Sequence, residues 1–177
     1  MDKRKRSPKR DLREIVRDLK ENVDSIAKLK VKLKNIVENG GDLNIKLYSG
    51  RTLMHYAVRY NRKGLIKLFY RLGVNAEICD DNYNTPLHYA ILKDNYQAVK
   101  ELIKLNVDIN LPAELEQTPL HMAVLKGNKD LVKLLVENGA DISLVDEKNL
   151  TALDYAYDEN DKDIINYLNS KMKLING

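Results

Sequence analysis

The segment QTPLHMAV, residues 117–124, is nearly repeated as NTPLHYAI at residues 84–91. Both segments contain Thr-Pro-Leu-His at the same place. A fixed interval of this kind is typical of proteins built from stacked copies of one structural unit. The interval extends in both directions, because four threonines lie 33 residues apart, at Thr52, Thr85, Thr118 and Thr151.

Apolar residues keep the same interval, which makes chance similarity an inadequate explanation. Small residues recur where neighbouring helices would approach closely, and larger ones recur in two further positions. The three series are Ala57, Ala90, Ala123 and Ala156; Ile66, Val99, Val132 and Ile165; and Phe69, Leu102, Leu135 and Leu168.

One unit, from Thr118 to Ile142, predicts two short helices. Thr118 suits the N-cap, and Pro119 suits the first helical position, where its missing N–H costs nothing. Gly127 ends the first helix, and Gly139 suits the C-cap of the second. Such a thin pair cannot bury both of its faces, so we expect it to stack on its copies.

Three histidines recur with the repeat, at His55, His88 and His121. They could suggest a metal site or a catalytic base. Equivalent positions on stacked helices are separated by about 8–10 Å, however, whereas Zn–N bonds are about 2 Å long. We therefore expect a structural role, with each imidazole bonded to backbone in its own or the adjacent repeat.

The interval and the TPLHYA and TPLHMA segments resemble those of ankyrin repeats, over residues 50–171. The resemblance implies an all-α ankyrin-repeat solenoid, in which a turn or β-hairpin precedes each pair of antiparallel helices. We expect four repeats plus a partial N-terminal repeat and a capping helix. The expected segments are 1–10 (a basic disordered tail), 11–49 (helical cap and partial repeat), and repeats at 50–82, 83–115, 116–148 and 149–177.

Some positions depart from the ankyrin pattern. Leu53 replaces the usual proline in the first repeat, and the last repeat reads TALD, with Asp154 in the histidine position. Three residues replace the usual turn glycine and leave the hairpin geometry open: Tyr83, Glu116 and Asn149.

Residues 11–49 predict the N-terminal end of the stack. Apolar residues from Leu12 to Ile26 follow helical spacing from a start near Asp11. A helix lying on a membrane surface is an alternative, although interspersed acids weaken it. The alternation in LKVKLK, residues 29–34, could indicate a strand, but the glycines that follow favour a helix. At the other end, SKMKLING is expected to fray.

The first ten residues are strongly basic. They hold six of the 30 Lys and Arg residues but one of the 26 acidic residues. Such a run could contact nucleic acid or acidic lipid, serve as a nuclear import signal, or be a solvated leader. Ser7 before Pro8 could be phosphorylated there. The basic residues are Lys3, Arg4, Lys5, Arg6, Lys9 and Arg10.

The remaining composition predicts an intracellular protein, cytoplasmic or alternatively nuclear. No apolar run reaches the roughly 18 residues of a membrane span, and the N-terminus lacks the apolar core of a signal peptide. The single cysteine, Cys79, cannot form an internal disulfide, although a reactive thiol is an alternative. Abundant Lys, Asn and Ile resemble an AT-rich genome, and by resemblance suggest a host-directed ankyrin protein.

The chain contains none of the common catalytic or phosphate-binding motifs. We therefore predict a non-enzymatic protein that needs no cofactor or metal. By the ankyrin resemblance, function is expected on the hairpin tips and the exposed side of the first helices. We define the strip as the twelve partner-binding candidates there: Tyr48, Arg51, Arg59, Tyr60, Asn82, Asn84, Leu92, Lys93, Leu115, Gln117, Leu125 and Lys126.

The strip runs from basic and aromatic residues in the first repeat to acids such as Asp158 beyond it in the last. Leu92 and Leu125 are one repeat apart, so we expect their side chains to adjoin in an apolar centre. This pattern predicts a monomeric scaffold or inhibitor that captures another protein. Two alternatives are that single exposed leucines carry no meaning, and that the protein is a nucleic-acid-associated regulator using its basic tail.

Overall fold

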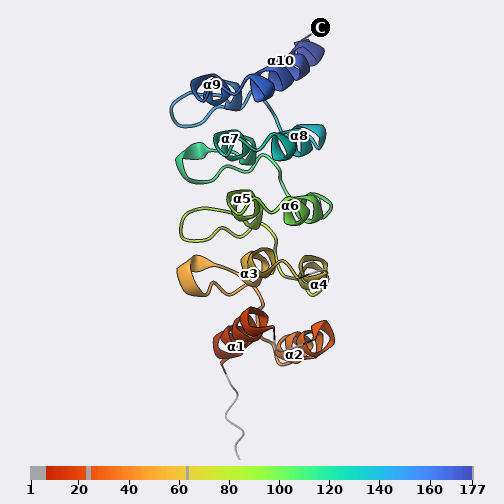
Figure 1. The fold of residues 1–177 in the computed structure, drawn as a ribbon. Helices are drawn as coiled ribbons and strands as arrows, with labels where there is room; N and C mark the ends of the chain where they lie inside the picture. The colour runs from red at the N-terminus through yellow and green to blue at the C-terminus, as the bar shows by residue number, and fades with distance from the viewer. Residues whose placement is uncertain (1–6, 23–24, 63, 177) are drawn as a thin grey trace, which may run out of the picture.

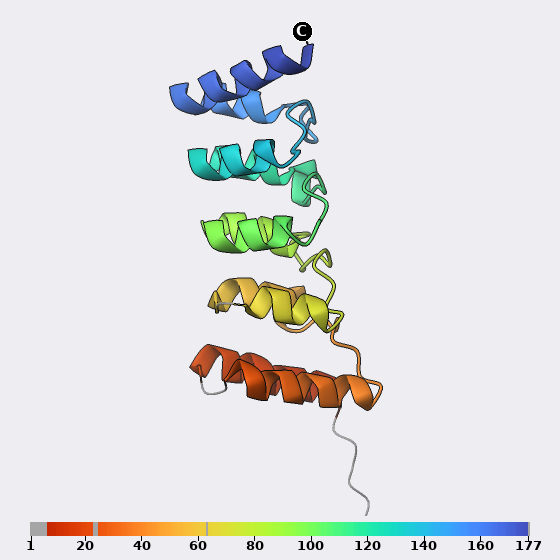
Figure 2. The same cartoon turned by 90° about the vertical axis from the view of Figure 1, so that its right-hand side faces the viewer.

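The computed structural model describes residues 7–22, 25–62 and 64–176. Within these residues the chain forms ten α-helices and no strand. The helices form five antiparallel pairs, stacked one above another in an elongated solenoid whose longer loops project to one side (Figure 1). The second view shows the paired helices lying nearly parallel from layer to layer (Figure 2).

Each layer consists of a first helix and a second helix. The first helices and the second helices each form a separate column in Figure 1. The layers in chain order are α1 (Pro8–Glu21) with α2 (Ile26–Glu38), α3 (Leu53–Tyr60) with α4 (Leu65–Arg71), α5 (Pro86–Leu92) with α6 (Tyr96–Ile103), α7 (Pro119–Leu125) with α8 (Lys129–Glu137), and α9 (Ala152–Asp158) with α10 (Lys162–Asn176).

Side chains define the helix starts at the positions that the sequence predicts. Thr85 and Thr118 cap α5 and α7, each followed by proline at the first helical position. Helices α6 and α8 use asparagine instead: Asn95 accepts from Ala98 N–H, and Asn128 from Leu131 N–H, both at 3.0 Å. Each cap satisfies a helix-end donor that would otherwise lack a partner.

The core lies between the two columns and between successive layers. The repeated alanines are buried, which lets the first helices approach one another closely. The repeated large residues of the second helices are fully buried as well, among them Phe69 and Leu102. A single layer buries too little apolar surface to be stable alone, so each depends on its neighbours.

The N-terminal segment differs from the expected boundaries. Helix α1 begins at Pro8 rather than near Asp11, since proline's fixed φ suits the first turn after Ser7. Lys9 and Arg10 are therefore helical and not part of a disordered tail, whereas Lys3, Arg4, Lys5 and Arg6 lie outside the described residues. The LKVKLK segment is helical within α2. Together α1 and α2 form a complete helix pair, with α1 packed against α3.

The C-terminal end also differs from expectation. The predicted fraying of SKMKLING is wrong for most of that segment, because α10 continues through Asn176. Amphipathic spacing continues along the helix, with Ile164 and Leu168 buried and Met172 packed against the core. The longer helix α10 therefore covers apolar surface of the layer that it forms with α9.

The loops before the first helices are turns in the described part of the chain. Two contain a short 3₁₀ turn, η1 (Tyr48–Gly50) and η2 (Glu114–Glu116). The three residues that replace the turn glycine nevertheless keep a left-handed backbone, with φ of 58° at Tyr83, 56° at Glu116 and 58° at Asn149. The turn position therefore imposes its conformation on residues that disfavour it.

Candidate functional site

The repeated histidines join each repeat to the next. His55 Nδ1 accepts from the Thr52 N–H at 3.2 Å, so Nε2 carries the proton and donates to the Asn84 carbonyl at 3.0 Å. His121 repeats this arrangement, accepting from Thr118 N–H at 3.2 Å and donating to Leu150 at 3.1 Å. The predicted structural role of the histidines is confirmed by these bonds.

Burial lowers the pKa of all three imidazoles. For His88, removal from water lowers the pKa to about 4, although the Gln117 backbone opposes the shift. Desolvation likewise lowers the pKa of His55 and of His121. Protonation at Nδ1 would also break the bonds from the capping threonine. At neutral pH these side chains are therefore uncharged caps.

The last repeat has aspartate at the position of the repeated histidine. Asp154 replaces histidine in α9, and its carboxylate accepts from Thr151 N–H at 2.8 Å and from the Thr151 hydroxyl at 2.6 Å. A carboxylate caps its own helix but cannot donate to a following layer. Asp154 is exposed, so the site tolerates a charge.

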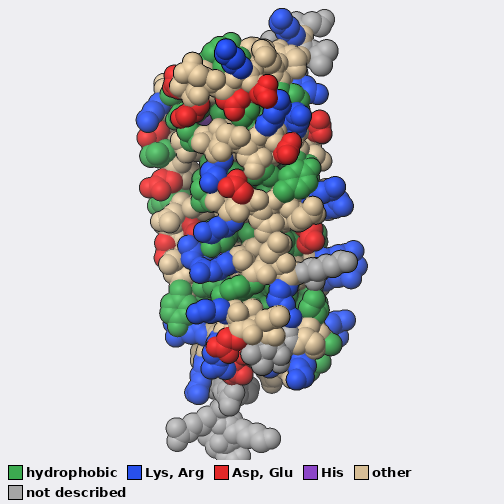
Figure 3. Space-filling view, viewed as in Figure 1, with side chains coloured by type: hydrophobic (Ala, Val, Ile, Leu, Met, Phe, Trp, Pro, Cys, Tyr) green, Lys and Arg blue, Asp and Glu red, His purple; other side chains and the backbone are tan. Residues whose placement is uncertain are grey.

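Most of the strip is accessible on the loop side of the first helices. Leu92, Leu115 and Leu125 are 39%, 46% and 40% exposed. Figure 3 shows basic side chains gathered over the lower half of the face it presents, with acidic and basic ones mixed towards the top. The other exposed members are Tyr48, Arg59, Asn82, Lys93 and Lys126, whereas Tyr60 and Gln117 are half-buried.

Two members of the strip are less available than the sequence indicates. Asn84 is 8% exposed, which corrects its placement on an exposed surface. Its backbone closes the preceding turn, donating to Asp80 Oδ1 at 3.1 Å. Arg51 is half-buried, 3.7 Å from Asp80 Oδ2 and 4.9 Å from the centre of the Tyr89 ring. Arg51 therefore serves mainly to join two repeats.

Cations of the strip lie over tyrosine rings. Lys93 Nζ is 5.5 Å from the ring centre of Tyr89, and the Arg59 guanidinium is 6.0 Å from that of Tyr60. The exposed ring of Tyr48 is covered by Arg13 of α1 at 5.0 Å. These contacts hold charged and aromatic groups together on the surface, as partner-binding surfaces often do.

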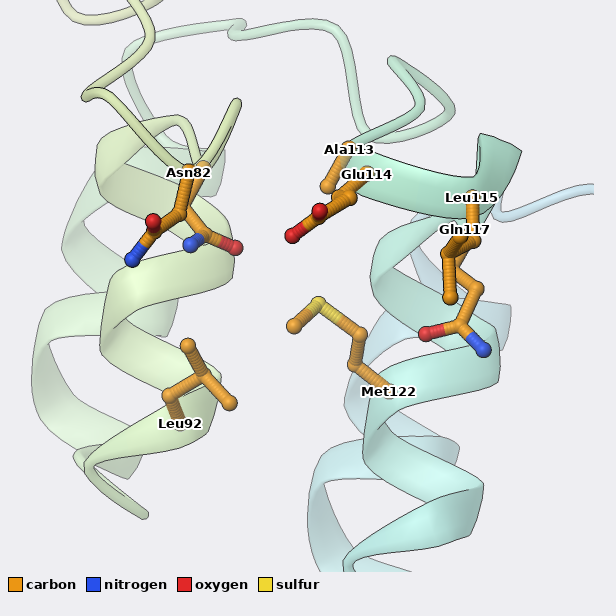
Figure 4. Close-up of a pocket in the computed structure, with 8 residues that line it drawn as sticks. Asn82, Leu92, Ala113, Glu114, Leu115, Gln117 and Met122 are labelled. Carbon is orange, nitrogen blue, oxygen red and sulfur yellow. The ribbon is translucent and has the colours of Figure 1, made fainter.

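A hollow of about 310 Å³ lies at the middle of the strip. We call it the central hollow, since it lies between α5 with its preceding loop and α7 with its preceding loop. Figure 4 shows Leu92 of α5 and Met122 of α7 facing each other across it, with the Glu114 carboxylate directed from the loop towards the side that carries Asn82. Its lining residues are Asn82, Asn84, Leu92, Ala113, Glu114, Leu115, Gln117 and Met122.

The structure thus brings together five members of the strip and leaves others apart. Leu125 does not line the hollow, so the expected pairing of Leu92 with Leu125 is replaced there by Leu92 and Met122. Sequence reasoning placed neither Ala113 nor Met122 in the site. A signal existed for Met122, because it lies one helical turn before Leu125 and shares its side of α7.

Other kinds of site find no support in the described part of the chain. Over residues 7–22, 25–62 and 64–176, no group of three His, Cys, Asp or Glu side chains is placed to hold a metal ion. Across the same residues, no helix is both long enough and apolar enough to span a membrane. The candidate site is the surface around the central hollow, where five members of the strip come together.

The protein is a helical repeat solenoid. Its helix pairs are stacked, its loops lie along one edge, and the exposed strip lies beside them. A family model described as ankyrin repeats in three copies matches residues 25–113 and again residues 106–176. These matches span most of the chain and include α2, so the chain belongs to the ankyrin repeat family. Ankyrin repeats are generally non-catalytic protein–protein interaction modules. A search of curated proteins found no match.

Proposed function

We propose that this protein is a non-catalytic scaffold or inhibitor that captures another protein along the strip. The observation that carries the proposal is the central hollow, where exposed leucines surround a concavity with a polar rim. Protein-binding surfaces commonly combine an apolar centre with polar margins in this way. Leu92 and Leu115 both line the hollow and are exposed rather than buried in the core, which supports a partner-binding surface.

Charge along the strip supports directional binding. Arg13 and Arg59 lie near the first repeats, whereas Asp158 and Glu159 are exposed on the last. A partner with the opposite distribution would be attracted in one orientation. These charges should affect association rate and orientation more than the bulk of the affinity, because exposed charges are screened by salt.

The test replaces Leu92 and Leu125 together with aspartate and measures binding of peptides selected from a random library on the wild-type protein. We expect binding to fall by at least about a hundredfold, since a charge would enter an apolar contact. The matched control places the same two charges at Val31 and Val37, exposed aliphatic residues of α2 in the other column. Equal binding by the Leu92/Leu125 variant and wild type, with unchanged melting, would refute the proposal.

A second candidate is a nucleic-acid-associated regulator, favoured by the basic surface of α1. Exposed Arg10, Arg13, Arg17 and Lys20 follow helical spacing, so they extend the basic sequence of residues 3–6 onto a folded element. The test replaces all four basic residues at positions 3–6 with glutamate. Ser7 and Pro8, where α1 begins, stay unchanged. Fluorescence anisotropy with duplex DNA and RNA should then lose a steeply salt-dependent signal. No such signal from the wild type at low salt would remove this candidate.

A further inference from the structure

The loop before α3 is bonded to the loop before α5, and the loop before α7 to the loop before α9. In the described residues no such bond joins the loops before α5 and α7, and we call this the central junction. Asp81 N–H donates to Ser49 O at 3.2 Å, and Glu147 N–H donates to Leu115 O at 3.1 Å. The equivalent bond at the central junction would run from Glu114 N–H to Asn82 O. All residues of these two loops are described by the structure, and this bond does not form between them.

The histidine bonds follow the same alternation. His55 and His121 each donate Nε2–H to a carbonyl of the following repeat. His88 Nε2 is buried and faces the Gln117 backbone, but it completes no hydrogen bond within the described structure. The contact from the histidine to the following repeat is therefore weaker at the central junction than at the junctions on either side.

Side-chain identities account for the difference. Tyr89 and Tyr155 place their rings edge-on to the histidine of the preceding repeat, at 5.9 and 6.0 Å between centres. The equivalent position at the central junction is Met122, which has no ring. Asp80 and Asp146 form the loop turns at the other two junctions, whereas the central one has Ala113.

The central junction is open only at its loop end. At the opposite end of the first helices, Lys126 Nζ lies 3.2 Å from Asp94 Oδ2, and Asn128 donates to the Asp94 Oδ1 at 3.2 Å. Beside the second helices, Asn110 donates to the Gly139 carbonyl at 3.3 Å. The opening therefore forms the central hollow and leaves the stack intact.

The hollow presents acceptors above an apolar floor. The Gln117 side chain donates its N–H to Tyr155 Oη at 3.4 Å, and Figure 4 shows its oxygen turned to the hollow side. Glu114 adds a carboxylate, and no Lys or Arg is among the described residues that line the space. Leu92 and Met122 provide the apolar surface below. The occupant should be cationic, rich in donors, and apolar along its stem.

We propose that the central hollow takes one arginine side chain from a polypeptide partner, an inference that rests on the proposed function. The stem would pack against Leu92 and Met122, and the guanidinium would donate to Glu114 and to the Gln117 oxygen. Arginine suits this geometry because its planar fork can bond a carboxylate with two N–H groups while the methylenes cover apolar surface. Lysine offers a single strongly hydrated point charge instead.

The test uses the peptides selected from a random library on the full-length wild-type protein. We expect the selected peptides to have an arginine in common. Citrulline has a similar shape but no charge, so replacing that arginine with citrulline should weaken binding by about tenfold or more. Glu114→Gln should remove the preference for arginine over citrulline. Glu116→Gln, an exposed control in the same loop outside the hollow, should keep it.

The outcomes separate this inference from the proposed function. Peptides that require Leu92 but bind equally well with citrulline, or with leucine at the anchor position, would overturn the arginine site and leave the proposed function standing. An undiminished arginine preference in Glu114→Gln would also overturn it. If no selected peptide depends on Leu92, both ideas fail.

Discussion

At the scale of single residues, His55 and His121 each perform two tasks. One ring nitrogen caps its own helix as an acceptor, and the other donates to the next repeat. Both tasks require the neutral ring and one particular tautomer. The stability of the stack is consequently linked to pH through residues that play no part in binding.

The His88 linkage gives a pH prediction. Above pH 6.5 the imidazole is neutral in folded and unfolded chains, and the pKa shift has no effect. Between pH 6.5 and about 4 the unfolded chain binds a proton that folded His88 does not. As the pH is lowered through this window, His88 should therefore reduce the free energy of unfolding by about 1.4 kcal/mol for each pH unit. Urea titrations across this window should show a shallower pH slope for His88→Gln; an identical slope would contradict the assignment.

The left-handed turn residues give a second prediction. Tyr83 is exposed at φ 58°, a conformation that costs a side-chain-bearing residue about 1–2 kcal/mol. Tyr83→Gly should stabilise the protein by about 0.5–1 kcal/mol, since glycine's larger unfolded-state entropy offsets part of the gain. The opposite change, Gly50→Ala, should destabilise it, because the new Cβ would overlap Asp81. Chemical denaturation measures both, and a destabilised Tyr83→Gly would show that the ring makes a needed contact.

At the scale of elements, one loop residue decides between two turn conformations. Asp80 Oδ1 accepts from Asn82 and Asn84 N–H groups at 3.0 and 3.1 Å. In the loop before α9, Asp146 Oδ1 accepts in the same way from Lys148 and Leu150 N–H groups. Leu47 and Ala113 hold the equivalent positions in the other two loops, which form η1 and η2 instead. Aspartate thus closes a loop by bonding its own backbone.

Ala113→Asp should therefore convert the third loop to the aspartate turn. The new carboxylate would accept from Leu115 and Gln117 N–H groups, with a gain of about 1 kcal/mol in the free energy of unfolding. Binding of the selected peptides should weaken at the same time, because the loop that forms one wall of the central hollow would move. Ala113→Leu, which copies the first loop, is the control. Unchanged peptide binding by a stabilised Ala113→Asp would contradict this account of the loop.

Sequence patterns predict the elements well and the site incompletely. The 33-residue interval and the Thr-Pro caps are local signals, so the paired helices from Thr52 onward follow directly from them. The start of α1 at Pro8 and the persistence of α10 depend on packing against the ends of the stack. The hollow depends on two side-chain differences between repeats. Ala113 lacks the carboxylate of the equivalent aspartates, and Met122 lacks the ring of the equivalent tyrosines. That signal emerges only when the equivalent contacts are compared in space.

At the scale of the whole molecule, the stack behaves as two closely joined pairs of repeats with an opening between them on the loop side. The α3–α4 and α5–α6 layers, each taken with the loop before its first helix, share loop, histidine and aromatic contacts, and so do the α7–α8 and α9–α10 layers. Neighbour contacts dominate the stability of a solenoid. The central junction should therefore open before the junctions on either side of it.

Hydrogen exchange measures this order directly. The amide of Glu114 has no acceptor in the described loops, whereas those of Asp81 and Glu147 are bonded to the preceding repeat. Exchange at Glu114 should be faster than at the two equivalent positions. Addition of a selected peptide should slow exchange at Glu114 most. Equal exchange at all three amides in the free protein would contradict the alternation of junctions.

The claim on which the account depends is that partners are held at the central hollow. Amide chemical shifts of the full-length protein, recorded during titration with a selected peptide, test it most directly. We predict that the largest changes fall on residues 82–92 and 113–122, with small changes on the second helices. Changes concentrated on α1, or on the second-helix column, with residues 113–122 unaffected, would contradict the account.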